Sequence, residues 1–168
     1  MTRSLNAIAI LLGVAGLIPF LACGYAATAW TGVPAGNALL ALLAYGAVTL
    51  SFLGGVHWGF ALGEPSTLLP PPAASGLRID QMRLLLGVVP SLVGWVALLV
   101  QIVFASAESG LAVLIAGFVG AVAVEAQARQ RALVPARYMW LRWLLSIIVV
   151  AVLTTVLVLR LLGARIIL

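Results

Sequence analysis

The sequence predicts an all-α integral membrane protein, a bundle of about five transmembrane helices, and three observations carry this prediction. Of the 168 residues, 64% are hydrophobic and only 8% are charged, and the mean hydropathy is +1.24, far from the composition of a soluble domain. Apolar runs long enough to cross a bilayer recur along the chain. The charged residues fall mainly between these runs. We therefore expect residues 1–168 to form a single transmembrane domain.

The first two spans are predicted over residues 5–29 and 38–62, neither of which contains Asp, Glu, Arg or Lys. At about 1.5 Å of rise per residue, each run is long enough to cross a hydrocarbon core of about 30 Å. Pro19 is expected to kink the first helix, because proline lacks an N–H and its ring clashes with the preceding turn. A Pro-rich inner loop, residues 65–76, is predicted to follow the second span, since consecutive prolines cannot continue a helix.

The last three spans are predicted over residues 84–104, 110–126 and 143–159. The fourth is short and has a polar inner end, so a tilted or interfacial boundary is an alternative there. An Arg-rich inner loop, residues 127–142, is predicted to join it to the fifth span.

Arginine placement predicts the orientation, because positively charged loops resist translocation across the membrane. With the N-terminus inside, five spans leave only Arg160 and Arg165 on the outer side. The other seven arginines then fall on the inner side: Arg3, Arg78, Arg83, Arg129, Arg131, Arg137 and Arg142. We expect the N-terminus inside and the C-terminus outside.

The residue inventory argues against several classes of function. The net charge of +5 is scattered between apolar runs and forms no basic module, so no nucleic-acid partner is expected. The chain has no lysine, which excludes a Schiff-base lysine, and Cys23 alone cannot form an intramolecular disulfide. No spacing typical of a zinc site and no nucleophile–base pair is visible. We therefore predict no metal or other cofactor and regard an enzyme as the least favoured class.

A ridge of small residues lies on the second predicted span. Ser51, Gly55, Gly59 and Gly63 recur every fourth residue, and such a ridge lets another helix backbone approach closely in lipid. The pattern predicts a helix-packing seam. Its partner is either another helix of the same chain or a second copy.

Four polar residues form a candidate ligand cluster on the inner half: His57, Glu64, Glu125 and Arg129. Ionisable groups inside a membrane are costly to bury and often functional. His57 is either a neutral imidazole hydrogen-bonded between helices or part of a proton relay or ligand site, with ligation of haem a weaker alternative. Glu125 and Arg129 are four residues apart, a spacing that also suits a plain ion pair at the membrane surface.

Two stretches, Gly16-Leu17-Ile18-Pro19-Phe20 and Ser51-Phe52-Leu53-Gly54-Gly55-Val56-His57-Trp58-Gly59, resemble the uncharacterised multipass membrane family that includes transmembrane protein 69. The resemblance implies a small multipass protein of the bacterial inner (cytoplasmic) membrane, with mitochondrial relatives in eukaryotes, and it implies no activity.

Two functional hypotheses remain open at this point. The first is a non-enzymatic subunit or assembly partner, whose partners are membrane lipids and either further copies of the chain or a larger complex. The alternative is a small transporter or binding protein for a proton, a quinone-like molecule or another small ligand. This alternative predicts that the side chains of the inner cluster face one cavity.

Overall fold

The structure, a computed structural model, describes residues 7–62, 74–130 and 136–163. These residues form six helices and no strand: α1 (Ala7–Ala15), α2 (Ile18–Ala29), α3 (Gly32–Leu62), α4 (Ala74–Phe104), α5 (Ala107–Gln130) and α6 (Ala136–Leu161). Five stretches are long and apolar enough to cross a membrane: Ile10–Ala29, Gly32–Trp58, Gly87–Phe104, Ala107–Ala126 and Trp140–Leu161. The prediction of an all-α bundle with about five spans is confirmed.

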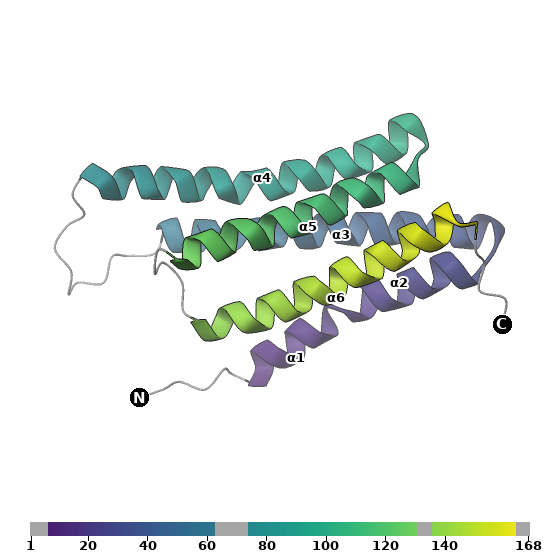
Figure 1. Cartoon of the computed structure of the whole chain (residues 1–168), viewed down its shortest axis with the longest axis horizontal. Helices are drawn as coiled ribbons and strands as arrows, with labels where there is room; N and C mark the ends of the chain where they lie inside the picture. Colours follow the sequence, from purple (N-terminus) through teal and green to yellow (C-terminus); the bar gives the residue numbers. More distant parts are fainter. Residues whose placement is uncertain (1–6, 63–73, 131–135, 164–168) are drawn as a thin grey trace.

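The helices run side by side along the long axis of the bundle (Figure 1). Helices α3 and α5 end, and α4 and α6 begin, at the same end of the bundle. We call it the inner end, because the arginine distribution predicts that it faces the cytoplasm. Helix α1 begins at the inner end and α6 finishes at the outer end, as an odd number of crossings requires.

The predicted loops are shorter in the structure than in the sequence-based expectation. Helix α4 already begins at Ala74, inside the predicted loop 65–76, whose earlier part, residues 65–73, lies outside the described residues. Helix α5 continues to Gln130 and α6 begins at Ala136, so most of the predicted loop 127–142 is helical. The expectation was wrong there because polar composition was taken as a loop signal, although Ala, Arg and Gln are good helix formers.

Pro19 interrupts the first span, as predicted: α1 ends at Ala15 and α2 begins at Ile18. The phenol of Tyr45 on α3 donates a hydrogen bond of 3.0 Å to the carbonyl oxygen of Gly16 at this break. The rings of Phe20 and Tyr45 meet edge to face with centroids 4.9 Å apart. The break is therefore fixed against α3.

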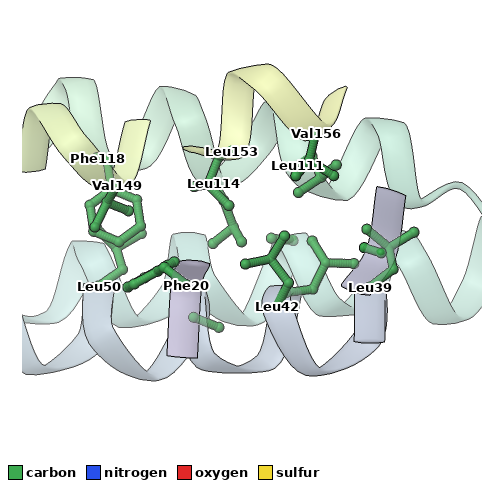
Figure 2. Packing of buried hydrophobic residues seen from close by; sticks show 14 of the residues in the cluster. Phe20, Leu39, Leu42, Leu50, Leu111, Leu114, Phe118, Val149, Leu153 and Val156 are labelled. Atoms are coloured by element: carbon green, nitrogen blue, oxygen red, sulfur yellow. The ribbon is translucent and has the colours of Figure 1, made fainter. Parts of the chain in front are cut away.

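The core lies where α2, α3, α5 and α6 meet, and Figure 2 shows its side chains interdigitating between these helices. Its largest fully buried side chains are Phe20, Phe118, Leu42, Leu43, Leu50, Leu111, Leu114 and Leu153. Many large apolar side chains elsewhere remain exposed, for example Phe52 and Ile102, each 73% exposed. An outer surface of this kind suits lipid, since lipid tails are as apolar as the side chains themselves.

Helices α3 and α4 approach most closely through two pairs of small residues. A Cβ atom on Gly54 would collide with the carbonyl oxygen of Gly87, and one on Gly94 would lie 2.9 Å from the carbonyl oxygen of Ala47. The two pairs are seven residues apart on each helix: Gly54 and Ala47 on α3, and Gly87 and Gly94 on the antiparallel α4. The indole of Trp58 closes the same interface with a 3.1 Å hydrogen bond to the carbonyl oxygen of Leu84.

We predict that Gly54→Leu lowers the free energy of unfolding by about 3 kcal/mol, because the added side chain meets the backbone of α4 and the helices must separate. Gly55→Leu is the matched control: a Cβ there would meet no atom of the described residues within 4 Å, so the change should stay within about 0.5 kcal/mol. Reversible unfolding of the full chain in detergent measures both. Equal destabilisation by the two variants would contradict the α3–α4 interface.

Candidate functional site

A pocket of about 360 Å³ lies between α3, α4 and α5, towards the inner end of the bundle. Its walls are mostly small or aliphatic: Val89, Pro90 and Val93 from α4, and Gly117, Gly120 and Ala121 from α5. Pockets for small ligands typically begin at about 300 Å³ and are mainly apolar with a few polar groups. This pocket has that composition.

Two glycines of α5 shape the pocket in different ways. Gly117 is packed tightly, because a Cβ there would lie 2.7 Å from atoms of both Leu50 and Val93. A Cβ on Gly120 would meet no atom within 4 Å in the part of the chain that the structure describes. Gly120, Ala116 and Val89 line the pocket and are also exposed on the outer surface of the bundle. The pocket therefore opens sideways between α4 and α5, at a depth where both helices form membrane spans.

Three polar residues line the inner part of the pocket: His57 from α3, Glu125 from α5 and Arg142 from α6. The Arg142 guanidinium forms an ion pair with the Glu125 carboxylate. Its Nη2 atom also donates a 3.1 Å hydrogen bond to the carbonyl oxygen of Leu53 on α3. Arg142 thus joins three helices at one point.

This ion pair is almost fully buried, since Glu125 is 3% exposed and Arg142 is 7% exposed. Within the described part of the chain, Glu125 Oε2 and Arg142 Nε have no hydrogen-bond partner. A buried polar atom without a partner costs about 1–3 kcal/mol. Both atoms are fully enclosed by protein, so the folded chain itself bears this cost.

A second ion pair joins the same two helices at the outer end. Arg160 Nε on α6 lies 2.8 Å from Glu108 Oε1 on α5. Both side chains are about one third exposed, at 34% and 33%. The two pairs have similar chemistry but very different burial, which makes the outer pair a natural control for the inner one.

The structure brings two residues of the predicted polar cluster, His57 and Glu125, to one pocket. Glu64 and the side chain of Arg129 lie outside the described residues, so their part in the cluster stays a prediction. Glu125 pairs with Arg142, which the sequence analysis had placed in a loop. The sequence does carry a sign that Arg142 is buried in the membrane. It lies inside an apolar run, between Trp140-Leu141 and Trp143-Leu144-Leu145.

The structure describes only part of the predicted helix-packing seam. Ser51 donates a 2.8 Å hydrogen bond to Ala47 on its own helix. Gly55 is exposed and contacts no other described helix, while the adjacent Gly54 makes the close approach to α4. Gly63 and the surroundings of Gly59 lie outside the described residues. The seam therefore stays a prediction, with its partner either within this chain or in a second copy.

No three side chains of His, Cys, Asp or Glu gather closely enough to hold a metal ion in the described part of the chain.

Comparison with known proteins places the chain in a family. The profile of the family described as "Protein of unknown function (DUF3429)" matches residues 5–158. The chain belongs to this family. It is 44% identical over 91 residues to transmembrane protein 69 of Xenopus tropicalis, a stretch that covers 54% of this chain. The match spans only 32% of that relative's length. No solved structure matches the chain.

Membership of the DUF3429 family agrees with the resemblance found in the sequence and with the five apolar spans: the chain is a multipass membrane protein of a family without assigned function.

We predict strong coupling between Glu125 and Arg142. Glu125→Gln or Arg142→Gln alone should cost about 3–5 kcal/mol of unfolding free energy, because each leaves a buried charge unpaired. The double variant should cost clearly less than the sum of the two. The corresponding changes at Glu108 and Arg160 should cost at most about 1 kcal/mol, since that pair is partly exposed. Additive costs at the inner pair, measured by unfolding in detergent, would contradict this assignment.

Proposed function

We propose that the protein binds a small amphipathic molecule from the lipid phase in the α3–α4–α5 pocket. The single observation that carries the proposal is the composition of the pocket: apolar walls that end at a buried ion pair and His57. The ligand-binding alternative expected His57, Glu64 and Glu125 to face one inner cavity, and the shared pocket of His57 and Glu125 supports the proposal. It supports binding over an activity in which the protein would need a nucleophile or metal set.

The sideways opening indicates how the ligand arrives. Exposed Gly120 and Val89 lie on α5 and α4 at the mouth of the pocket, and both belong to membrane spans. A molecule dissolved in the bilayer can reach the pocket between these helices without crossing water. Its apolar part would lie among valines and small residues, and its polar part would reach Glu125 and Arg142.

The test is the small-molecule content of protein purified from its native membrane, compared with Gly120→Leu. A Cβ at position 120 would meet no described atom within 4 Å, so a leucine has room to begin at the mouth of the pocket. The control is Ala123→Leu, because Ala123 is exposed on the same helix but does not line the pocket. We expect one molecule to co-purify stoichiometrically with the native chain and with Ala123→Leu, and to be lost from Gly120→Leu. Equal content in all three would overturn the proposal.

A second function, as an assembly subunit, rests on Gly55. This glycine and the neighbouring Phe52 are exposed on α3, so a helix of another chain has room to approach. If α3 docks onto a partner there, Gly55→Leu should lower the mass of the complex extracted from native membranes and leave the stability of the chain unchanged. An unchanged mass, measured by light scattering in detergent, would remove this candidate.

Two finer points of location belong to the same proposal. We propose an inner membrane, bacterial as the sequence analysis expected. The relative in Xenopus tropicalis fits a eukaryotic membrane instead, and fractionation of cells from the source organism separates the two. We also keep the orientation with the N-terminus inside, which rests on the arginine distribution alone.

A further inference from the structure

We infer that the pocket holds one linear acyl chain of a lipid from the leaflet at the inner end of the bundle, with its methyl end beside Val113 and its polar end at the level of His57. The inference rests on the proposed binding function of the pocket. It adds the chemical class of the ligand, the direction in which the ligand lies and the contact that limits its length.

The pocket is a groove that follows one face of α5. Its lining residues on this helix recur every third or fourth position, which places them on one face: Val113, Ala116, Gly117, Gly120, Ala121 and Val124. From the first to the last of these residues α5 rises about 16 Å, at about 1.5 Å per residue. This rise is about half of a hydrocarbon core of about 30 Å, which is the depth of one leaflet. The groove therefore has the length of an acyl chain in one leaflet, and it runs in the same direction.

The groove closes towards the outer end of the bundle. Helices α4 and α5 pack together there, because a Cβ on Gly110 would lie 2.9 Å from the carbonyl oxygen of Ala97. Nearer the inner end, a Cβ on Gly120 would meet no described atom within 4 Å, and Figure 1 shows α4 and α5 diverging in this direction. A chain that enters from the inner leaflet therefore ends near Val113, about one helical turn before the contact at Gly110.

The walls along the groove are hydrocarbon. Pro90 and Val93 of α4 and Leu53 of α3 line it together with Gly117 and Ala121 of α5. Water gains no hydrogen bonds from such side chains, and apolar cavities stay dry. An empty groove would leave its lining atoms without contacts on one side. The methylene groups of a lipid chain restore these contacts, at a depth where α4 and α5 both form membrane spans.

The polar residues described in the lining gather at the inner end of the groove. Glu125 follows Val124, the last apolar lining residue of α5, and Arg142 is its ion-pair partner. His57 lies near the inner end of α3. The span of α5 ends at Ala126, so this level is also the boundary of the membrane. An ester or carboxyl group at the end of the chain would lie here.

The test is photolabelling of the full chain in vesicles of phosphatidylethanolamine and phosphatidylglycerol. Two hexadecanoic acids serve as probes, one with a diazirine near the methyl end and the other with a diazirine near the carboxyl group. A third probe carries the methyl-end diazirine on an acyl chain of phosphatidylglycerol, and it separates a phospholipid chain from a free fatty acid as the source. Mass spectrometry of peptides identifies the labelled residues.

The expected labels follow the groove. The methyl-end probe should label Val113 and Gly117, and the carboxyl-end probe should label Val124, although all three residues are only partly exposed. Val119 reports the background, because it is 52% exposed on the same helix and does not line the groove. Gly120→Leu should lower labelling of Val113 roughly tenfold relative to Val119, because the leucine side chain competes with the acyl chain for the groove.

Two further variants support the assignment. Ala116→Leu adds a side chain to the same face of α5, about one turn from Gly120, and should give the same loss of label at Val113. Ala123→Leu changes an exposed residue that does not line the groove and should leave the labelling unchanged. The melting temperature in detergent shows that each variant is folded.

The outcomes separate the two levels of the proposal. Labelling that follows exposure alone, with Val113 unaffected by both groove variants, would overturn the acyl-chain inference, and labelling of Val113 by the carboxyl-end probe would overturn the direction. A co-purifying molecule that lacks an acyl chain, and is lost from Gly120→Leu, would overturn the inference and leave the proposed binding function intact. If nothing co-purifies and no label enters the groove, both fail.

Discussion

The close approach of α3 and α4 is the constraint on which the other features of the inner half depend. In lipid, helices gain little from the hydrophobic effect on association, so close packing of backbones has to supply much of the attraction. Gly54 against Gly87 and Gly94 against Ala47 allow that approach. Any side chain larger than hydrogen at Gly54 would meet the backbone of α4, which leaves this position no tolerance.

That contact determines the shape of the pocket. With α4 held against α3 through Gly54 and Gly87, the next turn of α4 places Pro90 and Val93 on the pocket wall, and Leu53 and His57 of α3 face the same space. Helix α5 closes the pocket through Gly117, which packs between Leu50 and Val93. The carbonyl oxygen of Leu53 then lies within reach of Arg142. The inner ion pair is therefore connected to the α3–α4 contact through a single turn of α3.

The sequence predicts the spans well, because length and hydropathy are local properties and each apolar run carries its own signal. The break at Pro19 is predictable for the same reason: a proline disrupts the turn before it wherever the helix lies. The ridge on α3 is different. Small residues every fourth position identify a face, yet Gly54 and Gly55 are neighbours, and only the position of α4 decides which of them is packed.

The polar site likewise combines residues that the sequence identifies with a pairing that only the fold determines. His57 and Glu125 are unusual residues in apolar runs, so their chemistry attracts attention in the sequence itself. Arg142 was assigned to a loop because it follows several other arginines, and its burial depends on where α5 and α6 begin and end. Pairing between Glu125 and Arg142 joins two helices through side chains far apart in the chain. The spacing of four residues favoured Arg129 as the partner of Glu125, because without the fold only pairs on one helix can be recognised.

The most direct test of the account is the register of α3 against α4 in a lipid bilayer. Solid-state NMR on the full chain, with glycine and alanine labelled with carbon-13, reports which of these residues lie close together without changing any side chain. The account predicts a through-space cross-peak between Gly94 and Ala47, and none between Gly55 and any alanine of α4. Absence of the first cross-peak in folded protein, or a contact of Gly55 with α4, would contradict it.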